Sequence, residues 1–176
     1  MYNYLKKNLF LISFIFVPIV YLWNPHWIGF LGIQPYWPLF WLLPWSMVYG
    51  STNGLIAGLF LGLTLDSISP DDSFTQIPGL LFCGIWFGRL GNCSNGFVEH
   101  FRHGLICSIG SFFCGSLYFS QILIQNIPDN NWLLYFPNIK NILAQVFITA
   151  LMAPLFCSRL LILFKRSKNR GNLVKM

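Results

Sequence analysis

The sequence is poor in charged residues, and above all in acidic ones. Charged side chains make up 9% of its 176 residues, and only five of them are aspartate or glutamate. Ordinary soluble domains carry about 25% charged residues, whereas 55% of this chain is hydrophobic and its mean hydropathy is +0.59. A chain of this length forms one domain, and so little charge cannot cover its surface in water. We therefore expect an integral membrane protein.

Motifs that carry catalysis are also missing. No GxSxG, HExxH or P-loop pattern occurs. Residues 99–103, "EHFRH", offer a glutamate and two histidines, but a zinc site needs three or four ligands, and we assign His26 to the opposite side of the membrane. Asp66, Asp71 and Asp72 gather in one loop, whereas the carboxylates of a two-aspartate membrane protease must converge inside the bundle. We expect no enzyme activity, no metal and no cofactor.

The cysteines show no pattern typical of redox or metal chemistry. Their number, five, is odd, and no CxxC spacing occurs. Four of them lie inside apolar runs, namely Cys83, Cys107, Cys114 and Cys157, and Cys93 lies in a polar loop. Buried cysteine usually behaves as a small hydrophobic residue, so we expect these side chains to serve packing.

Long apolar runs predict an all-α, polytopic transmembrane bundle. A spanning helix needs about 20 apolar residues, and the runs divide into about six segments: 8–23, 36–49, 53–66, 76–91, 104–125 and 139–164. The first has a basic start but no small-residue cleavage site after it, so we expect an uncleaved span. The short segments 36–49 and 53–66 form either two tilted spans or a re-entrant hairpin. The chain thus divides into one membrane domain, residues 1–164, and a basic tail, residues 165–176.

The distribution of lysine and arginine predicts the orientation, because cytoplasmic loops carry an excess of both. With a cytoplasmic N-terminus, the outer side holds Lys140 and four of the five acidic residues, namely Asp66, Asp71, Asp72 and Asp129. The inner side collects nearly all the basic residues: Lys6, Lys7, Arg89, Arg102, Arg159, Lys165, Arg166, Lys168, Arg170 and Lys175. We expect both termini in the cytoplasm, and a basic face toward anionic lipids rather than nucleic acid. Its main residues are Arg89, Arg102, Lys165, Arg166, Lys168 and Arg170.

Small residues recur at helical spacing on three segments. Residues four apart lie on one face of a helix, and small ones let membrane helices approach closely. The segments carry Gly54, Gly58 and Gly62, then Gly84 and Gly88, and then Gly104, Ser108, Ser111 and Gly115. These stripes predict close helix packing, and their spacing leaves open whether the contacts lie within the chain or with partners.

One further step of four along the first stripe reaches Asp66. An ionisable residue inside a membrane is a functional candidate, but Asp66 comes at the outer end of its segment, so we favour an interfacial residue that ends a helix. We place Arg89 at the inner end of the next segment, about 30 Å away, and expect no salt bridge between the two. We also expect leucine at Gly58 to disrupt assembly more than asparagine at Asp66.

Residues 36–91 resemble the MreD family, the rod shape-determining membrane proteins of bacteria. A proline-bearing apolar segment (Pro38, Pro44) precedes "GLIAGLFLGLTLD" and then "LLFCGIWFGRLG", and Gly54, Gly58, Gly62 and Asp66 match the family motif. The end of the chain, "ALMAPLF" followed by a basic tail, is also similar to that family. The segment "SISPDDSFTQIP" departs from it, since the family commonly has a glycine-containing turn there.

This resemblance implies a non-enzymatic scaffold of the cell-wall elongation machinery in the bacterial inner membrane. Its partners would be an MreC-like protein, a RodA-like protein, a transpeptidase and an MreB-like protein. The MreD fold is thought to be similar to that of the substrate-binding subunits of energy-coupling-factor transporters.

A small-molecule (vitamin-like) binding subunit of a transporter is therefore the alternative interpretation. Such a subunit needs a pocket with convergent polar groups, for which the sequence offers Asn53, Gln76, Gln121 and Gln125. Its relatives tend to carry an A-x-x-x-A docking helix, which is absent here. An ion-coupled transporter is a weaker interpretation, because no charged residue is predicted at mid-membrane.

Overall fold

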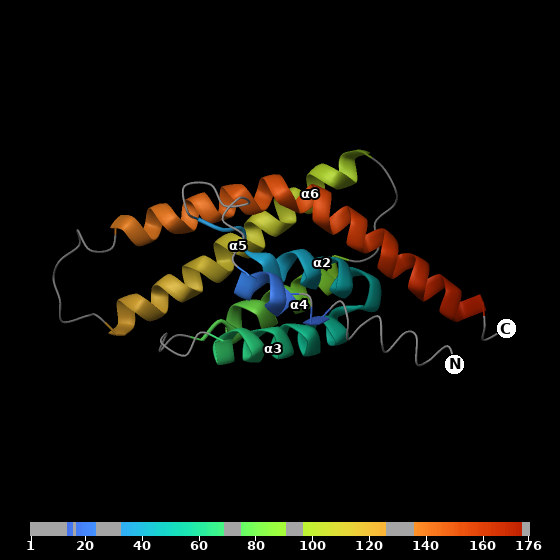
Figure 1. Cartoon of the computed structure of the whole chain (residues 1–176), viewed down its shortest axis with the longest axis horizontal. Helices are drawn as coiled ribbons and strands as arrows, with labels where there is room; N and C mark the ends of the chain where they lie inside the picture. Colours follow the sequence, from blue (N-terminus) through green and yellow to red (C-terminus); the bar gives the residue numbers. More distant parts are fainter. Residues whose placement is uncertain are drawn as a thin grey trace.

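The structure, a computed structural model, describes residues 14–15, 17–23, 33–68, 75–90, 97–125 and 136–173. Residues 14–15 and 17–23 are helical. Five further helices follow (Figure 1): α2 (Trp37–Tyr49), α3 (Ser51–Ile68), α4 (Ile77–Arg89), α5 (Phe97–Gln125) and α6 (Phe136–Leu173). The expected all-α fold is confirmed for this part of the chain.

The helices differ in length from the predicted segments. Helices α2 and α4 have 13 residues each, about 20 Å at 1.5 Å per residue, which is shorter than the hydrocarbon core of about 30 Å. Helix α5 begins at Phe97, ahead of the predicted residue 104, and has 29 residues. Helix α6 has 38 residues and continues through the basic segment, ending at Leu173. The described helices therefore do not form six full-length membrane spans.

Helix α6 carries the strongest membrane signal. Among the described residues, one helical stretch, Ile139–Asn169, is long and apolar enough to cross a membrane, with a mean hydropathy of 2.1 and 28% of its most apolar window buried. Its outward face exposes a large apolar side chain every four residues, namely Leu143, Phe147, Leu151 and Leu155. A face of this kind is compatible with association with a membrane.

Helix α2 is the centre of the bundle. It runs antiparallel to α3, and 11 of its 13 residues are buried. It is parallel to α4 and α6, because Tyr36 contacts Gln76 and Thr149 at its start, while Lys168 reaches Val48 near its end. Figure 1 shows α3 and α4 side by side on one flank of α2, and α5 and α6 crossing the other.

Two prolines shape α2. Pro38 occupies the first turn, where its missing N–H costs nothing. Pro44 lies inside the helix and leaves the carbonyl of Phe40 without its usual donor. The thiol of Cys157 on α6 donates to that carbonyl, with Sγ 3.7 Å from the oxygen. Helix α6 therefore supplies a donor where the proline removes one, so that this buried carbonyl does not go without a hydrogen bond.

An aromatic seam joins α2 to α6. The rings of Phe40 and Phe156 are stacked with centroids 5.6 Å apart, and the ring of Phe164 meets that of Trp45 edge-on at 5.4 Å. Beyond the seam, the ammonium of Lys168 donates to the carbonyl oxygen of Val48 at 2.7 Å. A cation is favoured there because the last carbonyls of a helix carry partial negative charge. Helix α2 ends at Tyr49, and the next residue, Gly50, has a φ of 93°, which suits glycine.

Candidate functional site

The glycine stripe of α3 lies directly against α4. A Cβ added at Gly58 would stand 2.5 Å from the carbonyl oxygen of Leu80, and one at Gly62 would stand 2.8 Å from Cα of Ile77. A Cβ at Gly54 would overlap the carbonyl oxygen of Gly84. All these neighbours are backbone atoms, so the two helices approach as closely as glycine allows.

The two glycines of α4 complete the same contact from the other side. A Cβ at Gly84 would overlap the carbonyl oxygen of Gly54, and one at Gly88 would overlap the backbone of Ser51. The five glycines at 54, 58, 62, 84 and 88, here named the glycine contact, therefore join α3 to α4 within one chain. This surface is not exposed to a partner while the two helices stay together.

The small residues of α5 make a looser contact. A Cβ at Gly104 would stand 3.0 Å from the carbonyl oxygen of Ala150 on α6, and one at Gly115 would meet the side chain of Ile142 at 2.8 Å. Ser111 is buried, and Ser108 donates to Leu105 in its own helix. The stripe on α5 therefore packs against α6 largely through side chains.

Asp66 lies near the end of α3 beside the beginning of α4. Its Oδ1 accepts a hydrogen bond of 2.9 Å from the backbone N–H of Gln76, the residue that caps α4. The carboxylate is thus placed at a helix N-terminus, where negative charge is favoured. Arg89 ends the same helix, which has 13 residues and is about 20 Å long, so Asp66 and Arg89 lie at opposite ends of α4. Helix α4 is long enough to keep the pair from bonding, which agrees with the expectation that they form no salt bridge.

The role of Asp66 can be tested by two substitutions. Asp66→Ala removes the acceptor of the Gln76 N–H and is expected to cost about 0.5–2 kcal/mol of stability. Asp66→Asn keeps an acceptor oxygen and loses only the favourable charge at the helix terminus, which is worth about 0.3–1 kcal/mol. Melting temperatures of the purified variants in a mild detergent measure both. Equal losses would show that charge, and not the hydrogen bond, fixes this helix end.

A polar network surrounds this end of the bundle. The hydroxyl of Tyr36 donates to Oε1 of Gln76 at 3.0 Å, and the backbone N–H of Tyr36 donates to Oγ1 of Thr149 at 3.0 Å. The side chain of Gln121 both accepts from and donates to the backbone of Thr75, at 3.0 and 3.1 Å. These bonds connect the start of α2 and the start of α4 to α5 and α6.

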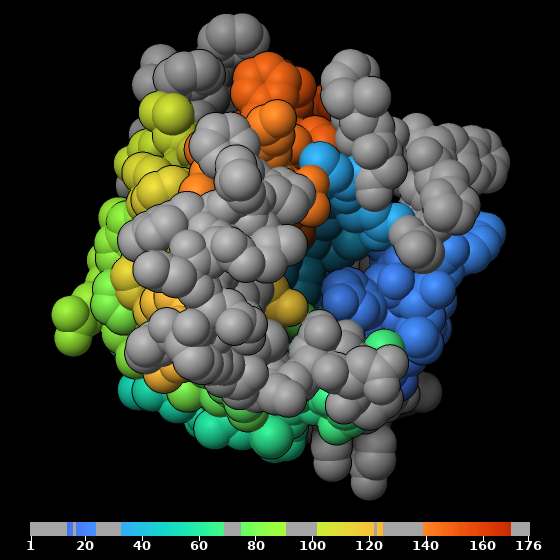
Figure 2. Space-filling view, turned by 90° about the vertical axis from the view of Figure 1, so that its left-hand side faces the viewer, coloured from blue at the N-terminus to red at the C-terminus, as the bar shows by residue number. Residues whose placement is uncertain are grey.

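The polar residues proposed for a small-molecule pocket do not all converge. Gln76 and Gln121 lie at the end described above, whereas Asn53 donates to Tyr49 at the other end of α3. The side chain of Gln125 lies outside the described part. Figure 2 views the molecule from the end with the polar network and shows a hollow between residues 17–23, α2 and α6.

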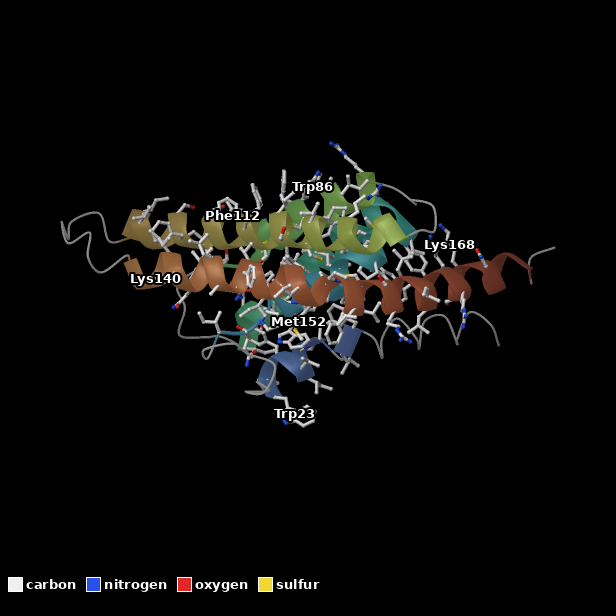
Figure 3. The ribbon with its side chains drawn as sticks, turned by 90° about the horizontal axis from the view of Figure 1, so that it is seen from above. Trp23, Trp86, Phe112, Lys140, Met152 and Lys168 are labelled. Atoms are coloured by element: carbon white, nitrogen blue, oxygen red, sulfur yellow. The ribbon has the colours of Figure 1, made fainter. Side chains whose placement is uncertain are left out.

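The basic residues are segregated along the bundle. Figure 3 labels Lys140 and Lys168 near opposite ends of α6. Arg89 ends α4, and Arg102 lies in the first turns of α5. Four more basic residues lie in the second half of the membrane-length stretch Ile139–Asn169 of α6, namely Arg159, Lys165, Arg166 and Lys168. The predicted basic face therefore gathers at the end opposite Asp66. The side chain of Arg170, like Lys6, Lys7 and Lys175, falls outside the described residues.

Metal ligands do not cluster in the part of the chain that the structure describes. No group of three or more histidine, cysteine, aspartate or glutamate side chains could hold an ion there. His103 is buried, with 5% of its surface exposed, while the side chains of Glu99 and His100, and also His26, Asp71, Asp72, Cys93 and Asp129, lie outside the described residues. Four cysteines are buried, as expected from their apolar runs.

Comparison of the chain with known protein families, with curated proteins and with solved structures finds no match.

Proposed function

We propose that this chain is a multi-pass protein of the bacterial inner membrane, with both termini in the cytoplasm, that serves as a non-enzymatic scaffold of the cell-wall elongation machinery. The proposal rests on the resemblance of residues 36–91 to the MreD family. The observation that best supports it is the glycine contact, because the motif residues Gly54, Gly58 and Gly62 form the seam of the α3–α4 pair.

The interior agrees with a scaffold. The core between α2, α4 and α6 is filled by aromatic and aliphatic side chains, and its largest fully buried members include Phe87, Phe164 and Leu43. The polar groups described at the α4 N-terminus bond to one another and to helix ends. Side chains arranged in this way fix helices in place, which is what a protein acting through its surface requires.

Two surfaces of the described part of the chain suit such partners. The outward face of α3 exposes Ile56, Phe60 and Leu63, on the side opposite the glycine contact. This apolar face suits the transmembrane helices of MreC-like, RodA-like and transpeptidase proteins. The basic face, with exposed Arg166 and Lys168, suits anionic lipids and cytoplasmic partners such as an MreB-like protein.

A pull-down from native membranes tests the proposal. We expect the tagged protein, extracted in mild detergent, to recover MreC-like and wall-synthesis proteins by mass spectrometry. Arg166→Glu places the wrong charge on the basic face and should reduce recovery of cytoplasmic partners several-fold. Lys140→Glu is the matched control, since it makes the same exposed change at the other end of α6.

A small-molecule-binding subunit of a transporter is the second candidate. The hollow in Figure 2 favours it, because the hollow opens at the end where Tyr36, Gln76 and Thr149 lie. Recovery of a transport ATPase and its membrane coupling subunit in the same pull-down would replace the scaffold proposal with this one.

A further inference from the structure

The four buried cysteines meet in two pairs between helices. Sγ of Cys83 on α4 lies 3.6 Å from Sγ of Cys114 on α5, and Sγ of Cys107 on α5 lies 3.7 Å from Sγ of Cys157 on α6. These distances correspond to direct contact between the sulfurs. The partners are 31 and 50 residues apart in sequence, so no short motif could reveal them.

Helix α5 contributes one thiol to each pair. Cys107 and Cys114 are seven residues apart, which places them two turns apart on the same face of a helix. Close packing brings α4 to this face, because a Cβ at Gly79 would stand 3.0 Å from Sγ of Cys114, and the carbonyl of Gly110 accepts from the thiol of Cys83. The two pairs therefore lie along one face of α5, toward α4 and toward α6.

We propose that Cys83–Cys114 and Cys107–Cys157 are two sites of reversible disulfide formation that tie α5 to both of its neighbours. A disulfide requires an S–S bond of about 2.05 Å, so each pair must close by about 1.6 Å, through rotation about the Cα–Cβ bonds and a small approach of the helices. The inference rests on this geometry alone and is independent of the proposed function.

The arrangement argues for more than packing by small side chains. Cysteines used only as small hydrophobic residues need no contact with each other, yet here each of the four buried thiols touches another one. Both contacts also lie between helices and not within one. A bond at Cys83–Cys114 would join the α3–α4 pair to the α5–α6 pair, a connection that the glycine contact does not make.

Each oxidation is a two-electron step. The two thiols lose their protons, one S–S bond forms, and two electrons pass to the oxidant. A lipid-soluble quinone would take up both electrons and both protons as its quinol. In the test, copper(II)–phenanthroline takes the electrons instead, so two complexes are reduced to copper(I) per disulfide and two protons are released.

Burial determines which oxidants can reach the pairs. Cys83, Cys107 and Cys157 have no exposed surface, and Cys114 has 8%. The pairs are thus shielded from hydrophilic reagents and accessible only to oxidants that partition into the apolar phase. Copper(II)–phenanthroline meets this requirement because its aromatic ligands enclose the metal ion. Reduction has the same requirement, so an oxidised pair would persist in the presence of a water-soluble reductant until the protein is unfolded.

The test counts free thiols in the full-length protein in its native membrane. After treatment with copper(II)–phenanthroline, the protein is denatured and labelled with a maleimide that adds visible mass. We expect labelling to fall from all five cysteines to Cys93 alone, and to return to five after reduction. Peptide mapping should recover the two linked pairs 83–114 and 107–157.

Single variants separate the two sites. Cys83→Ser should leave Cys93 and Cys114 labelled while the other pair is protected, and Cys83→Ala gives the same readout should serine disturb the apolar interior. Cys93→Ser is the matched control, because it leaves both pairs intact and should leave no free thiol. Full labelling after oxidation, or linkage of Cys93 or of two chains in place of the two pairs, would overturn the proposal.

Discussion

Alanine at Gly58 is expected to remove most of the folded protein, although it adds a single methyl group. The new Cβ would stand 2.5 Å from the carbonyl oxygen of Leu80 and 3.0 Å from its carbonyl carbon. These are backbone atoms, so α3 and α4 must separate along the glycine contact to admit it. Overpacking costs about 1–3 kcal/mol and occasionally more. We expect the upper end of this range because the contacted atoms are backbone, and such a cost outweighs the gain of about 1 kcal/mol from replacing glycine in a helix.

Gly115→Ala is the matched control. Its Cβ would also find a neighbour at 2.8 Å, but that atom is Cγ2 of Ile142, a side-chain methyl group and not backbone. We expect the loss to be smaller than that of Gly58→Ala, because the half-buried Ile142 can yield without separating the two backbones, while alanine improves helix propensity by about 1 kcal/mol. The yield of monodisperse protein and its melting temperature in detergent measure both variants. Similar losses from the two would show that backbone contact between α3 and α4 is not what limits stability.

The second large effect is expected from Phe164→Ala. The ring of Phe164 is 2% exposed and meets those of Trp41 and Trp45 edge-on, with centroids 6.5 and 5.4 Å away. Removing a buried phenylalanine leaves a cavity and costs about 3–5 kcal/mol. Since this ring fastens the C-terminal half of α6 to α2, we expect that half of the helix to become sensitive to limited proteolysis.

The neighbouring residue supplies the control. Leu163 is 53% exposed and lies on the outward side of α6, so Leu163→Ala removes an apolar side chain without opening a cavity in the core. Its melting temperature and protease resistance should stay close to those of the unsubstituted protein. Were Leu163→Ala to destabilise the fold as strongly as Phe164→Ala, the aromatic seam would not be the main attachment of α6.

The pattern of apolar and small residues predicts much of the fold. The run 36–49 corresponds to α2 to within a residue, and the runs 53–66 and 76–91 overlap α3 and α4 closely. The lengths of α5 and α6 could not be predicted in the same way. Hydropathy shows which part of a helix is apolar and not where the helix ends. It therefore cannot predict the polar starts of both helices or the basic end of α6.

The candidate site shows the same division. Asp66 could be placed at a helix end because polar residues follow it at once in the sequence. Its partner could not be predicted, since the backbone N–H of Gln76 is available to it only because α4 returns antiparallel to α3. Gly110 contacts the edge of the Phe87 ring. It belongs to no spaced motif, so the sequence did not predict this contact.

The sequence by itself determined an all-helical chain suited to a membrane, the separation of basic from acidic positions, and the small-residue faces through which helices approach. These are local properties, readable from composition and from a period of 3.6 residues. Only the tertiary structure decided that the glycines join α3 to α4 and that the cysteines meet in pairs. It also decided that the thiol of Cys157 donates to the carbonyl that Pro44 leaves without a donor. Each of these depends on which helices become neighbours, and that choice is made by the packing of all the helices together.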